Sequence, residues 1–178
     1  MGKNNIAIVV SIPMVARVFL AHQINALVEN YRVTIITNLK GSDSILDNIS
    51  KRVIVIDLPI ERNINLFLDL KALFLLIIIF YKNKFTLVHS VSPKAGLLAA
   101  LASFVARVPN RVHTFTGQVW MTKKGISRSL LKFLDKIIVG LNTNILVDSF
   151  SQNDFLIKEG VIKNNLSIVL GNGSISGV

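Results

Sequence analysis

Mostly apolar runs of strand length alternate along the chain with longer segments of helical periodicity. The first run, Asn5–Ile12 (NIAIVVSI), has the composition of a strand that is buried on both faces of a parallel sheet. Six further strands are predicted at Arg32–Thr37, Val53–Leu58, Phe85–His89, Arg111–Phe115, Asn144–Ser149 and Ser167–Leu170. Helices are predicted at Val15–Asn30, Leu66–Lys82, Pro93–Arg107, Gly125–Asn142 and Ser151–Glu159. This alternation indicates a doubly wound α/β domain with a mainly parallel sheet of about seven strands and helices on both faces.

Residues that begin and end helices support this prediction. Ser92 is a candidate N-cap before Pro93 at the first helical position. Ser151–Asp154 resembles a capping box, and Gly160 suits the left-handed end of the same helix. Because the 178 residues contain no repeat and no low-complexity linker, we expect residues 1–178 to form one domain.

The segment Leu66–Lys82 is unusually apolar. Every residue from Ala72 to Tyr81 is apolar, yet these ten residues would rise only about 15 Å, half of the roughly 30 Å of a bilayer core. A membrane-spanning helix is therefore excluded. We interpret the segment as a deeply buried helix, with a membrane-dipping or partner-binding face as the alternative.

A basic stripe follows the helix predicted at Gly125–Asn142. Lys124, Arg128, Lys132 and Lys136 recur at every fourth position, and leucine and isoleucine residues fall largely on the opposite side. The pattern predicts that the leucine face packs on the sheet and the basic stripe faces outward. A stripe of one charge sign suits either solvent or an anionic membrane surface.

The composition limits the classes of molecule that the chain is expected to bind. Twenty Lys and Arg against ten Asp and Glu give a net charge of +10, which favours an anionic partner. Nucleic acid is not expected, because aromatic residues make up only 7% and no helix-turn-helix, zinc, RNP or KH signature is present. No metal site is expected either, because the chain has no cysteine and the three histidines are far apart.

The chain lacks the sequence motifs of several enzyme classes. It has no P-loop and no GxSxG motif. Its first strand-to-helix loop has no glycine, which argues against a dinucleotide-binding oxidoreductase.

Small polar residues follow the predicted strands. In a parallel sheet the carboxyl ends of the strands share one edge, where ligands bind. Hydroxyl, amide and imidazole groups gathered there suit a polyhydroxylated ligand, and helix N-termini suit a phosphate. The candidates are Ser11, His89, Ser90, Thr116, Gly117, Gln118, Ser149 and Ser151.

The loop Thr116–Trp120 is the most distinctive of these segments. It follows the strand Arg111–Phe115 and combines Gly117, the Gln118 amide and Trp120. We predict an exposed Trp120 that serves as a platform for a sugar. The alternative is a turn with a half-buried tryptophan.

Four ordered motifs resemble one family. HSVSPKAGLLA (89–99), RVHTFTGQVW (111–120), ILVDSFSQNDFLIKEGV (145–161) and IVLGNGSISGV (168–178) are similar to the N-terminal domain of family 4 glycosyltransferases. These are retaining enzymes of the GT-B fold, and many of them build bacterial surface polysaccharides, such as capsule or O-antigen, on undecaprenyl carriers.

The resemblance implies a division of labour. The N-terminal domain would hold a lipid-linked saccharide acceptor, and a C-terminal domain, absent here, would bind the nucleotide-sugar donor. Gly171, Asn172 and Gly173 would begin the inter-domain hinge on the donor side, and this half alone would be inactive. No cofactor or obligatory metal is expected in this domain. The implied location is the cytoplasm, peripheral on the inner face of the plasma membrane.

Two departures from the family pattern leave the catalytic residues unknown. The first loop reads Ser11-Ile12-Pro13-Met14, where the family often has a glycine-rich loop. Thr116 stands where many members have a histidine, and a threonine hydroxyl can bind a sugar but does not carry a proton at neutral pH. Thr116, Gly117 and Gln118 are therefore expected as substrate contacts only. The alternative function is a non-catalytic, membrane-recruiting subunit that pairs with a separate catalytic domain.

Overall fold

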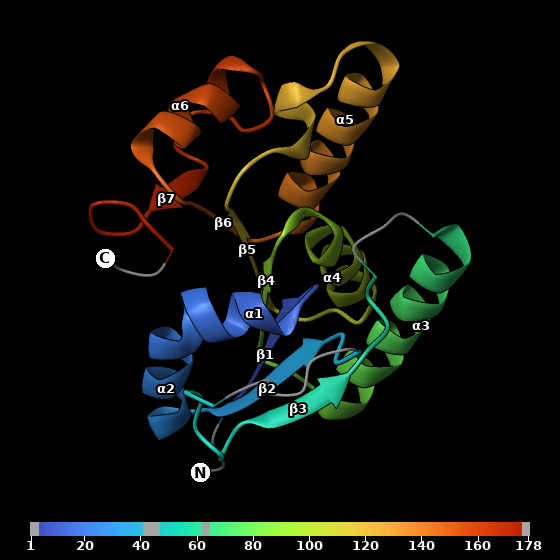
Figure 1. The fold of residues 1–178 in the computed structure, drawn as a ribbon, viewed down its shortest axis with the longest axis vertical. Helices are drawn as coiled ribbons and strands as arrows, with labels where there is room; N and C mark the ends of the chain where they lie inside the picture. Colours follow the sequence, from blue (N-terminus) through green and yellow to red (C-terminus); the bar gives the residue numbers. More distant parts are fainter. Residues whose placement is uncertain (1–3, 41–46, 62–64, 176–178) are drawn as a thin grey trace.

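A seven-stranded parallel sheet forms the centre of the molecule, in the order β3-β2-β1-β4-β5-β6-β7 (Figure 1). The computed structural model describes residues 4–40, 47–61 and 65–175. The doubly wound α/β prediction is confirmed, and β4 begins two residues later than expected. The strands are β1 (Asn5–Val10), β2 (Arg32–Thr37), β3 (Ile54–Asp57), β4 (Leu87–Val91), β5 (Asn110–Phe115), β6 (Asn144–Val147) and β7 (Ser167–Val169).

Helices cover both faces of the sheet because alternate strand residues point to opposite sides. Ala7 and Val9 of β1 join the core formed with α3 and α4, whereas Ile6 and Ile8 join the core formed with α2. The helices are α1 (Pro13–Val15), the π-helical turn η1 (Ala16–Leu20), α2 (Ala21–Asn30), α3 (Leu66–Asn83), α4 (Pro93–Val105), the 3₁₀ turn η2 (Val119–Thr122), α5 (Gly125–Leu141) and α6 (Phe150–Lys158).

The helix expected at Val15–Asn30 is interrupted. Its buried residues, Ala16, Leu20, Ile24 and Val28, are four positions apart. A regular helix of 3.6 residues per turn would rotate such positions off one face, and the wider turn at η1 compensates.

The prediction that α3 is deeply buried is wrong. Ala72, Leu76 and Phe80 pack into the core, but the opposite side of the helix is exposed over its whole length. The reason is that α3 lies at the outside of the helical layer, with α4 as its neighbour (Figure 1). Within the described residues, no helix has the length and apolar content that a membrane crossing requires.

The orientation predicted for α5 is also wrong in part. Leu131 and Ile138 do pack inward, but Ile126, Leu130 and Phe133 are exposed. The basic stripe divides: Arg128 and Lys132 form ion pairs with Glu159 after α6, while Lys124 and Lys136 stay exposed. The part of the stripe formed by Arg128 and Lys132 therefore lies against the residue that follows α6.

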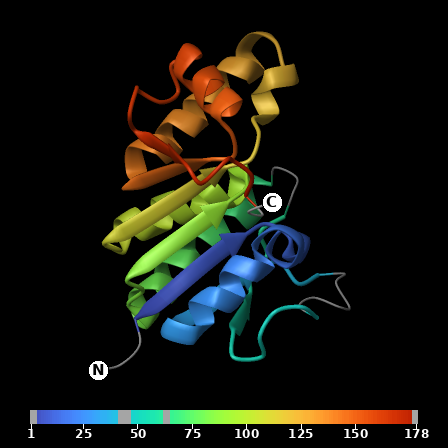
Figure 2. The same ribbon diagram turned by 90° about the vertical axis from the view of Figure 1, so that its left-hand side faces the viewer.

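The chain after β7 turns back across the sheet. Gly171 and Gly173 have φ angles of 56° and 90°, conformations that glycine adopts readily. The amide of Ile175 donates to Asp148 Oδ1 at 2.6 Å, and Gln23 Nε2 of α2 donates to the Ile175 carbonyl at 2.7 Å. This C-terminal segment therefore lies against the carboxyl end of β6 and against α2 (Figure 2).

Candidate functional site

The carboxyl ends of β1, β4, β5 and β6 are neighbours in the sheet, so the loops that follow them meet at one edge. Ser11, after β1, has its hydroxyl 2.9 Å from the hydroxyl of Ser92, after β4. Thr116 and Gln118 follow β5, and Ser149 follows β6. The structure thus brings together hydroxyl and amide groups from four loops. We call this set, Ser11, Ser92, Thr116, Gln118 and Ser149, the polar rim.

Ser92 holds a strained conformation at this rim. Its φ of 81° lies outside the regions that residues other than glycine favour, and such strain costs on the order of 1–3 kcal/mol. Ser92 is the N-cap residue before Pro93, as predicted, but its side chain does not cap α4 and bonds to Ser11 instead. Strained residues of this kind cluster at ligand-binding sites.

His89 and Ser90 point to opposite faces of the sheet because they are adjacent in β4. Ser90 is buried, 2.9 Å from His113 Nδ1, so its predicted place at the edge is wrong. Its hydroxyl belongs to the core beneath α4. Burial lowers the pKa of His113 to about 3 and that of His89 to about 4, so both rings are neutral at pH 7.

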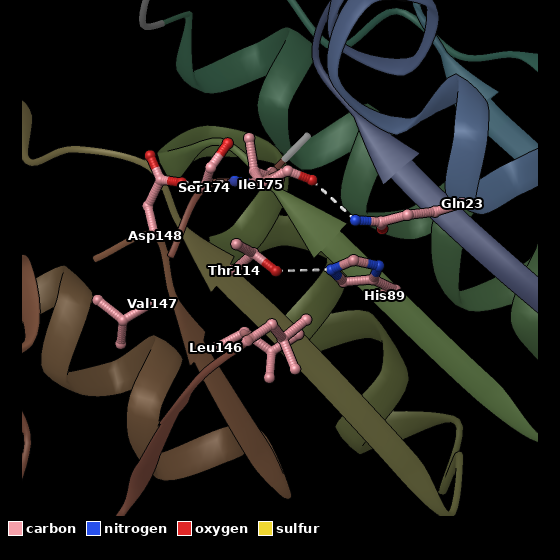
Figure 3. A pocket seen from close by; sticks show the side chains of 9 residues that line it. Gln23, His89, Thr114, Leu146, Val147, Asp148, Ser174 and Ile175 are labelled. Carbon is pink, nitrogen blue, oxygen red and sulfur yellow. Dashed lines mark hydrogen bonds between the residues drawn. The ribbon is translucent and has the colours of Figure 1, made fainter. Parts of the chain in front are cut away.

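His89 lines a small cavity between the sheet and the C-terminal segment (Figure 3). Its Nε2 lies 2.8 Å from Thr114 Oγ1, and Gln23, Asp148 and Ser174 complete the polar lining. The cavity measures about 20 Å³, enough for one water molecule. A sugar does not fit here, so the structure places His89 beside the rim rather than on its open side.

The loop Thr116–Gln118 provides the open part of the rim. Thr116 and Gly117 are exposed, and Gly117 has a φ of 143° that a residue with a Cβ rarely adopts. The Gln118 Nε2 amide is shielded from solvent and has no hydrogen-bond partner. An unpaired buried donor costs free energy, and a ligand acceptor at this position would satisfy it.

The prediction of an exposed Trp120 is wrong. The side chain is 1% exposed, and its ring stacks on Phe155 of α6 with centroids 5.4 Å apart. The indole Nε1 donates to Asp135 Oδ2 of α5 at 2.7 Å. Trp120 therefore anchors the loop to α5 and α6 and does not offer its face to a sugar.

Three charged side chains complete this anchor. The Arg128 guanidinium lies 5.3 Å from the Trp120 ring centroid and Lys132 Nζ lies 5.8 Å from it, within the range of cation–π attraction. Both cations donate to Glu159 at 2.8 Å, and the hydrogen bonds from Lys132 and Arg128 lower the pKa of that carboxyl. Arg128 and Lys132 thus form ion pairs within the domain, and the membrane-facing position of the basic stripe stays a prediction.

Asp135 is expected to make stability depend on pH. Burial raises its pKa from 3.8 to about 6, and the hydrogen bond from Trp120 opposes that shift. Because the folded state binds this proton more tightly than the unfolded chain, this contribution to stability is present below pH 4 and is lost as pH rises toward 6. An Asp135→Asn variant keeps an oxygen acceptor for Trp120 and does not titrate. Its free energy of unfolding relative to wild type should therefore rise by on the order of 2 kcal/mol between pH 4 and 7.

Urea unfolding of both proteins at pH 4, 5, 6 and 7 measures this difference. All other carboxyl groups are common to the two proteins, so their titration cancels in the comparison. A difference that stays constant over this range would show that Asp135 has an ordinary pKa.

The remaining candidates have structural contacts. Ser149 caps α6, where its Oγ accepts from the Gln152 amide at 3.2 Å, so the cap lies two residues before the predicted Ser151. The left-handed end at Gly160 is confirmed by its φ of 65°.

Within residues 4–40, 47–61 and 65–175, no three His, Asp or Glu side chains form a group suited to a metal ion.

Sequence reasoning missed three residues of this region. Asp148 follows β6 and fixes the C-terminal segment, Asp135 holds Trp120, and Ser92 pairs with Ser11. Only Asp148 carried a signal, as an acidic residue at a predicted strand end. The partners of Asp135 and Ser92 are distant along the chain, so no local pattern marks them.

Comparison with known proteins places the chain in a family. The model of the family described as "Glycosyl transferase 4-like" matches residues 9–149. The capsular polysaccharide biosynthesis glycosyltransferase CapM of Staphylococcus aureus is 37% identical over 121 residues, 68% of this chain and 32% of that protein. An Escherichia coli UDP-Gal:alpha-D-GlcNAc-diphosphoundecaprenol alpha-1,3-galactosyltransferase is 31% identical over 113 residues, 63% of this chain and 29% of that protein. The chain belongs to the glycosyl transferase 4-like family, as the motifs predicted.

Solved structures agree on the fold. A UDP-GlcNAc 2-epimerase from Neisseria meningitidis has a TM-score of 0.69 at 18% identity, covering 96% of this chain and 46% of that one. A glycosyltransferase from Rickettsia africae has a TM-score of 0.65 at 18% identity, covering 96% and 43%. The chain thus spans about a third of the curated relatives and less than half of these two structures.

Proposed function

We propose that this chain is the acceptor-binding half of a retaining glycosyltransferase. The complete enzyme moves a sugar from a nucleotide-sugar donor to a lipid-linked saccharide in surface polysaccharide synthesis. The observation that carries the proposal is the polar rim, which gathers side chains from four adjacent loops in a chain of the glycosyl transferase 4-like family. The printed names of the two relatives, which refer to a capsule and to a diphosphoundecaprenol acceptor, support the kind of substrate.

The rim suits an acceptor sugar chemically. Thr116 and Ser11 bring hydroxyl groups that donate and accept, and Gln118 brings an amide donor without a partner. Gly117 carries no side chain, so a ligand can approach the loop backbone at this position. The described residues of this half bind and orient the acceptor. The donor diphosphate binds to a second domain, which closes over the polar rim.

Gln118→Ala tests this role in a protein that carries both domains. We expect sugar transfer to the acceptor to fall about fivefold or more, because one hydrogen bond to the acceptor is worth about 1 kcal/mol or more. Hydrolysis of the donor in the absence of acceptor should stay within twofold of wild type, because the donor lies on the other domain. Both rates are measured by release of the nucleoside diphosphate.

Asn164→Ala is the matched control, since it removes an exposed amide from the loop before β7, at the opposite edge of the sheet. It should leave both rates unchanged. Equal transfer by Gln118→Ala and wild type would remove this loop from the acceptor site. Loss of donor hydrolysis in parallel with transfer would instead assign the loop to the donor.

A further inference from the structure

An uninterrupted apolar stripe covers the outer side of α3. It consists of Phe67, Leu70, Phe74, Ile78 and Tyr81, spaced three or four residues apart and hence on one helix face. Phe67 is 78% exposed and Phe74 is 68% exposed. At 1.5 Å per residue the stripe is about 21 Å long. Apolar surface of this extent on a folded domain marks an interaction site.

Further exposed apolar side chains lie at the end of α4, the helix that packs beside α3 (Figure 1). Phe104 and Val105 are exposed there and line an open groove together with Arg107 and Arg111. The Arg111 guanidinium lies 5.8 Å from the Phe104 ring centroid. The groove thus combines one aromatic ring with two arginines.

The exposed charged side chains on α3 and directly after it have one sign. Lys71 and Lys82 are exposed on α3, and Lys84 is exposed directly after it. The acidic residue of this helix, Asp69, is 17% exposed and lies 2.6 Å from Lys94 of α4 in an ion pair. The surface is therefore apolar at its centre and basic at its border, on a chain with a net charge of +10.

We infer that this face, formed by the α3 stripe and the Phe104–Arg111 groove, docks on an anionic lipid bilayer. The α3 helix lies flat in the interface, because the buried side chains of Ala72, Leu76 and Phe80 hold its other side on the domain. The apolar side chains enter the acyl region, and the basic border meets the lipid phosphates. A second copy of the chain is the less suitable occupant, because it would bring two basic borders together.

The docking face does not include the polar rim or the residues of the loop Thr116–Gln118. It therefore goes beyond the proposed sugar transfer, and neither proposal depends on the other. Binding to vesicles needs no donor or acceptor. Failure of one proposal can thus be told from failure of the other.

The test is cosedimentation of the 178-residue chain with vesicles of phosphatidylglycerol and phosphatidylcholine, and with vesicles of phosphatidylcholine alone. Wild type should bind the anionic vesicles, and added salt should weaken the binding. The double variant Phe67→Ser/Phe74→Ser should bind at least tenfold more weakly, and Lys71→Gln about fivefold more weakly, since one basic residue near such a surface is worth about 1 kcal/mol. Both variants should keep the thermal midpoint of wild type, because the changed side chains are exposed.

Val18→Ser/Phe19→Ser is the matched control. It removes two exposed apolar side chains from η1, which packs with α2 in the core on the other face of the sheet, and should bind within twofold of wild type. Equal binding by the Phe67→Ser/Phe74→Ser variant and wild type would overturn the proposal, and so would absence of wild-type binding to anionic vesicles. A dimer in sedimentation equilibrium that the Phe67→Ser/Phe74→Ser variant converts to a monomer, without vesicle binding, would assign the face to a second copy.

Discussion

Replacing Trp120 with alanine is expected to lower the free energy of unfolding by about 3–5 kcal/mol, as measured by urea denaturation. The indole is the largest fully buried side chain of the domain's described residues, and it fills the space between η2, α5 and α6. Its removal leaves a cavity against Phe155 and leaves the buried carboxylate of Asp135 without its donor. The cations of Arg128 and Lys132 also lose the ring that they cover.

Two variants separate these contributions. Trp120→Phe keeps most of the ring but not the Nε1 donor, so it should lose about 1–3 kcal/mol. Phe133→Ala on α5 removes an aromatic side chain that is 57% exposed and should change stability by less than about 0.5 kcal/mol. A loss below about 1 kcal/mol for Trp120→Ala would mean that the indole is not packed as described, and would return Trp120 to the candidates for a sugar platform.

Replacing Gly96 with alanine is expected to destabilise the domain by about 3 kcal/mol, although alanine is the better helix former. Gly96 lies in α4 directly over His113 of β5, and a Cβ at this position would stand 2.7 Å from His113 Nδ1 and closer still to Cε1. The imidazole cannot easily move away. Ser90 holds its Nδ1 at 2.9 Å, and its ring packs edge-on against Phe115 with centroids 4.6 Å apart.

Gly140→Ala on α5 is the matched control, because nothing lies within 4 Å of the added Cβ. It should stabilise the domain by about 0.5–1 kcal/mol. Adding His113→Ala to Gly96→Ala should recover part of the loss, since the two changes act on one contact and are not additive. If Gly96→Ala were as stable as wild type in thermal unfolding, the close approach of α4 to β5 would be wrong.

The local pattern of apolar and polar residues was sufficient to predict the α/β fold. The seven strands and most helices followed from apolar runs and helical periodicity, because a parallel strand buried on both faces is apolar at nearly every position. The edge of the sheet that carries Ser11, Thr116 and Gln118 followed as well, since the ends of parallel strands share one edge. The interruption at η1 and the turn η2 were not predicted, and their sequences contain no proline or glycine that would mark them.

The errors concern which side of an element is covered. Ser90 was predicted at the edge of the sheet, but its position in β4 points its side chain to the face that carries His113. Nothing in the sequence distinguishes the four basic residues Lys124, Arg128, Lys132 and Lys136 from one another. In the structure, Arg128 and Lys132 form ion pairs with Glu159. The apolar stretch of α3 looked like a core helix, although one of its sides has no neighbour. For Ser90 and the basic stripe the deciding partner comes from a distant part of the chain, whereas the exposed side of α3 lies at the outside of the helical layer.

The sequence by itself determined the α/β architecture, the family and the edge of the sheet at which polar groups gather. Each of these depends on periodicity or on ordered motifs within short segments. Only the tertiary structure showed that Trp120 is buried against Asp135 and that Arg128 and Lys132 lie over its ring. It also showed that the outer side of α3 is exposed. Burial and charge pairing depend on contacts between residues far apart in the sequence, and those contacts exist only once the chain is folded.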